Sequence, residues 1–350
     1  MVSFFKQGAK TLFPGYFALV MATGALSIGS FLLGMTVIAD LLFYCNVIFY
    51  IALWLLTLTR LMRYFPLLAD DATSHARGPG FFTLVAGTSV FGSQLVVVAG
   101  EYAIAFYLWL LAIILWLIVM YTFFFAVTVR RDKPTMAEGI NGAWLIAAVG
   151  TQSVSILGTL LSPHVAEGRI IMLFFTLCMY FLGCMLYLNI ITLIFYRFTF
   201  LEFQHAALTP PYWINMGAVA ITTLAGSTLI LHADYWLLLT EITPFLKGFT
   251  LFFWITGTWW IPLLLFLMIW RHLYHRYPFS YEPQFWGMAF PLAMYTTSTF
   301  QLSRALEVPF LTAIPHVMVY VAIAAWLFGI SGLIRHLFTG YMQSRQLSGS

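Results

Sequence analysis

Long, uninterrupted apolar runs constrain the fold of this sequence more than any other feature. A helix needs about 20 mostly apolar residues to cross ~30 Å of hydrocarbon, and runs of that length recur along the whole chain. The strands of a membrane β-barrel would instead alternate in polarity over segments of about ten residues. We therefore predict an all-α integral membrane protein, whose ten transmembrane helices span residues 13–34, 41–59, 81–99, 102–129, 143–161, 170–196, 212–232, 245–270, 285–303 and 312–338.

The small share of charged residues supports this prediction. Only 8% of the 350 residues are charged and 62% are hydrophobic, whereas a soluble domain has about 25% charged residues. No polar linker divides the runs, so we expect one membrane domain over residues 1–350. We expect no metal and no other cofactor, and no catalytic motif in a suitable context indicates an enzyme. The cysteines lie inside apolar runs without metal-ligand or disulfide spacing, at Cys45, Cys178 and Cys184.

Lysine and arginine are distributed unequally between the two sides of the predicted bundle. The net charge of +4 therefore informs about orientation and does not indicate nucleic acid as a partner. Cytoplasmic loops of membrane proteins are enriched in Lys and Arg, which predicts that both termini are cytoplasmic, in a bacterial inner (plasma) membrane. The side of the N-terminus has Lys6, Lys10, Arg60, Arg63, Arg77, Arg130, Arg131, Lys133, Arg197, Arg271, Arg276, Arg335 and Arg345, and the opposite side has Arg169, Lys247 and Arg304.

Small and hydroxyl-bearing residues are concentrated in every second run, starting with the first. Fairly short outer turns join the runs in pairs, which indicates five helical hairpins. The small residues could serve close helix packing in lipid, or they could line a conduit. Their recurrence in all five odd runs favours an inner ring of odd helices around a pore, inside an outer ring of even helices. The predicted pore-lining residues are Thr23, Gly24, Ser27, Thr88, Ser89, Gln94, Gln152, Ser153, Asn215, Thr223, Thr297 and Ser298.

Charged residues avoid the middle of every predicted span. Carriers driven by protons or sodium usually need carboxylates or cation sites within the membrane. A neutral conduit can instead attract anions through amide and hydroxyl donors and through helix N-terminal dipoles. We therefore predict a channel or uniporter for small anions. A secondary carrier, proton-coupled, for C4-dicarboxylates such as malate or for sulfite is the alternative, because both kinds of protein can use this scaffold.

Three segments resemble one known family. Residues Phe13–Gly24 resemble the opening helix of the tellurite-resistance/dicarboxylate transporter family, which includes bacterial tellurite-resistance anion channels, plant guard-cell slow anion channels and fungal malate permeases. Trp213–Gly217, followed by Ala225-Gly226, is similar to the family's seventh helix, and Trp286–Pro291 to its ninth. Through span number, orientation and the alternation of helices, the resemblance covers essentially the whole chain.

The resemblance implies a homotrimer in which each protomer holds its own pore, closed by a phenylalanine of the ninth helix. Phe290 is the matching residue, and Pro291 follows it. Proline lacks a backbone N–H and clashes with the preceding turn, so the helix is expected to kink there. A bulky ring beside a kink can project into a pore. We therefore predict that Phe290 and Pro291 form the gate.

Overall fold

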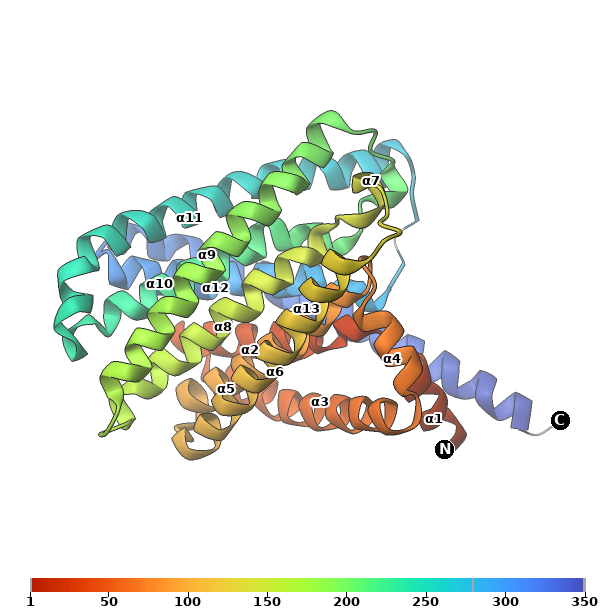
Figure 1. The fold of residues 1–350 in the computed structure, drawn as a ribbon, viewed down its shortest axis with the longest axis horizontal. Coiled ribbons are helices and arrows are strands. Elements are labelled where there is room, and N and C mark those ends of the chain that lie inside the picture. The colour runs from red at the N-terminus through yellow and green to blue at the C-terminus, as the bar shows by residue number, and fades with distance from the viewer. Residues whose placement is uncertain (1, 279, 349–350) are drawn as a thin grey trace.

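The computed structural model describes residues 2–278 and 280–348, and the side chains of residues 5–278 and 280–342 within them. The side chain of Arg345, one of the predicted cytoplasmic cations, thus lies outside the described residues. Every regular element of the described part is helical, which confirms the predicted class (Figure 1). Three short helices, α1 (Val2–Lys10), α4 (Phe65–Ala72) and α7 (Met136–Gly139), were not predicted.

Ten longer helices form the body of the protein. They alternate between an inner and an outer set. The inner helices are α2 (Ala18–Leu32), α5 (Phe82–Gln94), α8 (Ile146–Leu161), α10 (Ile214–Leu231) and α12 (Trp286–Ala305). The outer helices are α3 (Thr36–Arg63), α6 (Tyr102–Val129), α9 (Arg169–Phe200), α11 (Leu237–Ile269) and α13 (Ala313–Ser348).

Nine segments of the described part are long and apolar enough to cross a membrane. The ninth predicted span, residues 285–303, is helical as α12 but is not among the nine segments that length and hydropathy select in the described part. Its second half carries the hydroxyl run Thr296–Thr299 and then Arg304, which lower its hydropathy. The nine segments are Pro14–Leu32, Thr36–Arg63, Gly78–Ala99, Tyr102–Val129, Gly142–His164, Arg169–Phe200, Pro210–Leu231, Leu237–Tyr274 and Pro309–Met342.

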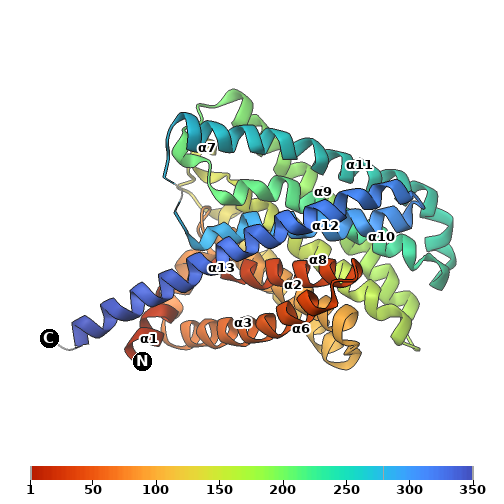
Figure 2. The ribbon, with the colours of Figure 1, turned by 180° about the vertical axis from the view of Figure 1, so that it is seen from behind.

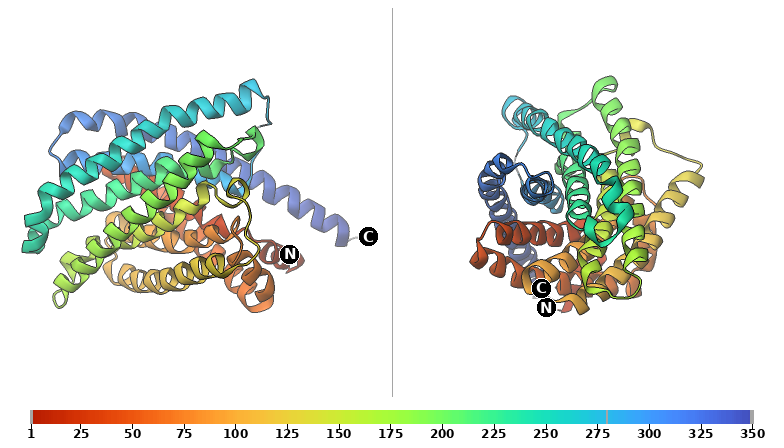
Figure 3. Two further views of the ribbon diagram at one scale, coloured as in Figure 1. Left: turned by 45° about the horizontal axis from the view of Figure 1, so that its top comes forward. Right: turned by 90° about the vertical axis from the view of Figure 1, so that its left-hand side faces the viewer.

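The inner helices contact one another in a closed order. α2 contacts α5, α5 contacts α8, α8 contacts α10, α10 contacts α12, and α12 returns to α2. Each inner helix also contacts the outer helix that follows it in the chain. The right-hand view of Figure 3, from the end opposite the termini, shows the helices surrounding the middle of the bundle. Both termini lie at one end of the bundle (Figure 2).

Burial separates the two sets of helices. In the apolar windows of the four inner spans, 83–94% of the residues are buried, against 22–50% in the five outer spans. Outer helix α6 shows the cause, because Ala105, Trp109, Ala112 and Trp116 recur at helical spacing on its buried face. The exposed face of α6 is also apolar, and includes Tyr107, Ile114, Ile118, Tyr121 and Phe125. Such a surface suits lipid and not water.

Proline or glycine begins the short turn that leads into every inner helix. A 3₁₀ turn precedes each of the five, and four of these turns have proline in their first two positions. The first N–H groups of a helix have no partner within it, so proline there removes no hydrogen bond. The five turns are Pro14–Phe17, Gly78–Phe81, Gly142–Leu145, Pro210–Trp213 and Pro283–Phe285.

Buried arginines close three of the hairpins at the same end. Arg60, Arg197 and Arg271 lie at or just beyond the carboxyl ends of α3, α9 and α11. Each donates from Nη1 to a backbone carbonyl two residues before the 3₁₀ turn of its own hairpin, namely that of Leu12, Ile140 or Leu208. The repeated contact joins the carboxyl end of each of these outer helices to the amino end of the inner helix that precedes it in the chain.

Candidate functional site

A cavity of about 250 Å³ opens where the five inner helices begin. Its lining comes from every one of these segments and from the loops between them. Apolar side chains form its inner part, with Met21 from α2, Ile146 and Val149 from α8, Ile214 from α10 and Phe290 from α12. We call this cavity the vestibule.

A second, much smaller cavity of about 20 Å³ lies deeper in the ring. All five inner helices line it, and Ser93, Ser153 and Thr297 are its only hydroxyl residues among the described lining. The rest of its lining is apolar: Ala25, Ile28, Val90, Ile156, Ile221, Leu224 and Met294. We call it the deep cavity.

The two cavities lie along the same helix faces. On α2, Ala18 and Met21 line the vestibule and Ala25 and Ile28 line the deep cavity, at intervals of three or four residues. Residues at that spacing share one face of a helix. The same spacing of three or four residues occurs in α8 and in α12. Positions 146 and 149 of α8 and 287 and 290 of α12 line the vestibule, and positions 153, 156, 294 and 297 line the deep cavity. The two cavities therefore follow one another along the same faces of the inner helices, and we call the line that joins them the axial path.

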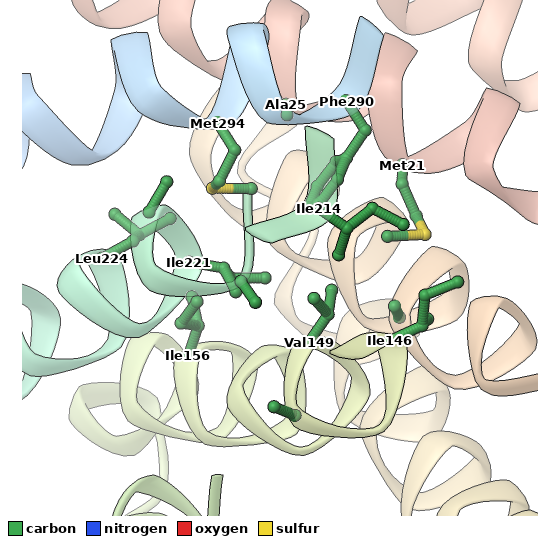
Figure 4. Packing of buried hydrophobic residues seen from close by; sticks show 14 of the residues in the cluster. Met21, Ala25, Ile146, Val149, Ile156, Ile214, Ile221, Leu224, Phe290 and Met294 are labelled. Atoms are coloured by element: carbon green, nitrogen blue, oxygen red, sulfur yellow. The ribbon is translucent and has the colours of Figure 1, made fainter. Parts of the chain in front are cut away.

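Phe290 lies at the inner end of the vestibule, one helical turn before Met294 of the deep cavity. Its side chain is 1% exposed. Figure 4 shows Phe290, Met21 and Ile214 among apolar side chains that converge from α2, α8, α10 and α12. The axial path is thus filled by side chains between the two cavities, at the level of this ring.

Pro291 faces α10. A Cβ atom on Gly217 would lie 2.6 Å from Pro291 Cγ, so only glycine allows this approach of the two helices. Helix α12 continues through the proline. Pro291 therefore fixes α12 against α10 at the level of the Phe290 ring.

Hydroxyls of the inner helices accept hydrogen bonds from aromatic side chains of outer helices. Tyr50 donates to Thr88, Trp116 to Thr151, Trp254 to Thr299 and Trp326 to Thr23, over 2.8–3.2 Å. In each case the donor belongs to the preceding hairpin, and the pair from α13 to α2 closes the circle. In the remaining hairpin, Tyr187 of α9 donates to the backbone oxygen of Asn215 on α10. A buried indole or phenol needs such an acceptor.

Four of the other predicted pore-lining residues also contact neighbouring helices. Ser27 donates to Ala39 O, Gln152 to Tyr180 O, and Gln94 accepts from Asn46 Nδ2 at 2.7 Å. A Cβ on Gly24 would lie 2.8 Å from Val90 Cγ1.

Within the described residues, three of the twelve side chains hydrogen-bond only backward within their own helix, and two have no side-chain partner. Thr223 and Ser298 donate to Val219 O and Tyr295 O. Ser153 donates to Gly150 O and lines the deep cavity. Thr297, which also lines it, donates to Ala25 O and Ala293 O. The hydroxyl of Ser89 and the side-chain amide of Asn215 are buried without a hydrogen-bond partner.

The mouth of the vestibule is polar. Asn141 caps the turn before α8 by accepting from Ala143 N at 2.9 Å. Arg77, Glu138 and Arg197 also line the cavity. Burial, together with Arg130 and Lys133, lowers the pKa of His75, next to the lining residue Ala76, which favours the neutral imidazole. In the part of the chain that the structure describes, no cluster of His, Cys, Asp or Glu could hold a metal ion.

Sequence reasoning missed the apolar residues of the axial path, among them Met21, Val149, Ile221 and Met294. Their spacing of three, four or seven residues is a signal in principle. Because the inner helices are buried on all sides, however, hydropathy does not distinguish their axial face from the others. The sequence identifies Arg197 only as one of the cytoplasmic charges, and it does not show that this side chain is buried.

The closed ring of buried helices, its axial path and its apolar outer surface define a multi-pass membrane protein of the channel or transporter class. Residues 11–334 match the family of voltage-dependent anion channels, and the chain belongs to that family. The resemblance drawn from the sequence motifs is thereby confirmed. The family is one of channels and transporters, and membership implies anion transport across a membrane.

Three relatives with similar sequences are named as uncharacterized membrane proteins or transporters. An uncharacterized membrane protein of Mycobacterium tuberculosis is 36% identical over 152 residues, which cover 43% of this chain and 77% of the relative. Two uncharacterized transporters of Methanocaldococcus jannaschii are 24% identical over 303 residues and 25% identical over 307 residues. These alignments cover 83% of this chain in both cases, and 84% and 83% of the two relatives.

Proposed function

We propose that the chain is a channel or uniporter that passes small anions along the axial path and is closed by Phe290. The observation that carries the proposal is the pair of cavities on shared helix faces, interrupted at the Phe290 ring. In this proposal ten helices cross the membrane as five hairpins, with α12 as the ninth span. Its polar residues are no obstacle, because α12 is enclosed by α2, α10 and α13.

The direction of the inner helices supports a preference for anions. All five begin at the vestibule, so their N-terminal N–H groups and dipoles make that end of the path electropositive. Deeper in the path the lining is mostly apolar, and such constrictions close channels by excluding water. Ser153 and Thr297 are the predicted pore residues that lie on this path.

The inner helices carry no acidic residue. A proton-coupled carrier would need a group that binds and releases the proton along the path. The absence of acidic residues from the inner helices therefore favours a channel or uniporter that is not coupled to protons over a proton-coupled carrier of C4-dicarboxylates or sulfite. We further propose that both termini are cytoplasmic in a bacterial inner membrane, and that three copies assemble as a homotrimer.

The proposal is tested by current measurements on the purified protein in planar bilayers with equal pH on both sides. We expect anion currents that persist without a pH gradient. Substrate flux into proteoliposomes that stops when the pH gradient is removed would establish the carrier alternative instead.

A further inference from the structure

Arg197 is a buried cation that faces the vestibule without a carboxylate partner. Its side chain is 8% exposed and lines the cavity. The ion pairs within the described residues join Arg60 and Arg77 to Asp71, and none includes Arg197. A buried charge without a counter-charge is costly to keep, so a resident or visiting anion would stabilise it.

Part of the hydrogen-bonding capacity of the Arg197 guanidinium group has no partner within the described residues. Both hydrogen bonds recorded for Arg197 in the described part come from Nη1, to Ile140 O and to the Tyr212 hydroxyl. Its Nε is buried without a hydrogen-bond partner. The rings of Phe203 and Tyr212 lie 5.3 and 5.8 Å from the guanidinium carbon and hold its plane. The side chain is therefore fixed in place while part of its donor capacity is unused.

The surroundings add to the positive potential at this place. The 3₁₀ turns Gly142–Leu145 and Pro210–Trp213 begin α8 and α10 at the vestibule, and residues of both turns line it. The positive ends of the α8 and α10 dipoles therefore lie at the vestibule, and they favour negative charge there. Glu138 also lines the cavity, but it is exposed and accepts a hydrogen bond from Thr135 at 3.1 Å.

We propose that Arg197 forms the core of an oxyanion-binding site in the vestibule, where a planar anion of the carboxylate type docks before it reaches Phe290. This inference rests on the proposed function, since it assigns the first stop on the same path. A guanidinium edge offers two parallel N–H donors that match the two oxygens of a carboxylate. A spherical halide uses such an edge less well, so the site distinguishes oxyanions from chloride.

The competing explanation is that Arg197 only closes its hairpin. Arg271 provides the matched comparison, because it makes the same kind of backbone contact, to Leu208 O, and is 6% exposed. Its Nε is likewise unpartnered, and it packs over the Tyr277 ring at 4.2 Å. Arg271 does not line the vestibule. A purely structural role would therefore give both arginines the same mutational behaviour.

The experiment measures the thermal unfolding of the full chain in detergent, titrated with sodium formate or sodium chloride at constant ionic strength. We expect formate to stabilise the wild type and Arg271→Lys more than chloride does. Arg197→Lys keeps the charge but loses the planar fork, and its apparent formate affinity should fall about tenfold, the effect of one charge-assisted hydrogen bond. The ratio of formate to chloride conductance should fall in the same variant.

Two results overturn the site. One is equal stabilisation of the wild type by formate and by chloride. This comparison uses no variant, so it tests the site even if Arg197→Lys does not fold. The other is an equal loss of formate stabilisation in Arg197→Lys and Arg271→Lys. Failure of the proposed function looks different. In that case formate binding depends on Arg197, but neither the wild type nor a variant with a shortened Phe290 side chain conducts anions.

Discussion

Replacing Phe290 by alanine separates a gate from an ordinary core residue. The ring is 1% exposed and stands between the vestibule and the deep cavity. Removing a packed Phe side chain costs about 3–5 kcal/mol when the residue only fills a core. If the ring must leave this packing for an anion to pass, opening costs a similar amount. Its removal should then raise anion conductance on the order of 100-fold, the equivalent of about 3 kcal/mol.

The assay is single-channel or macroscopic current in planar bilayers at equal pH. Phe290→Leu leaves a smaller obstruction and should give a smaller rise. Phe82→Ala is the matched control, because Phe82 is 0% exposed but packs against Phe123 of α6, away from the axial path. This control should lower stability without opening the protein. If Phe290→Ala folds, assembles and stays as closed as the wild type, the gate assignment is wrong.

Three further predictions concern stability and orientation. Asp71→Asn should destabilise the protein by about 3–5 kcal/mol, because Arg60 Nη2 lies 2.6 Å from Asp71 Oδ2 and both side chains are largely buried. Thermal unfolding measures this loss, and Asp70→Asn, at an exposed position, is the near-neutral control. Gly217→Ala should force α12 away from α10 at Pro291, destabilise the protein by about 1–3 kcal/mol and raise the basal anion current. Gly248→Ala is the control and should change neither stability nor current, because its Cβ meets open space. An unchanged current in Gly217→Ala would mean that the α10–α12 contact does not hold the gate. Cysteines placed at Lys6 and Ser344 should resist an impermeant thiol reagent added outside intact cells, while cysteines at Asp40 and Asp234 should react. Strong external labelling of either terminus would contradict the ten-span model with both termini cytoplasmic.

The bounds of the helices were predictable where the chain is uniformly apolar. α6 covers Tyr102–Val129, the same range that the apolar run predicted, because polar residues stand on both sides of it. α11 starts at Leu237, eight residues before the predicted 245, since Glu241 and Pro244 resemble a loop in sequence. The helix nevertheless continues through Pro244, so local propensity did not decide its start.

The lining of the axial path was less accessible to sequence reasoning. Polarity singled out hydroxyl residues such as Thr23 and Thr88, which accept hydrogen bonds from Trp326 and Tyr50. In lipid, a buried indole or phenol has no water to bond, so the inner helices supply the acceptors. Polar residues of a buried helix therefore report on its polar neighbours as readily as on a pore. Which face meets the axis depends on packing that only the structure shows.

The central claim is that anions cross through this chain without coupling to protons, and a reversal potential tests it most directly. With a tenfold gradient of potassium chloride and equal pH on both sides, a purely anion-selective current reverses at the chloride equilibrium potential, ~59 mV in magnitude. We predict reversal close to that value for the wild type when it opens and for Phe290→Ala. Reversal near the potassium potential, or current that vanishes without a pH gradient, would contradict the claim.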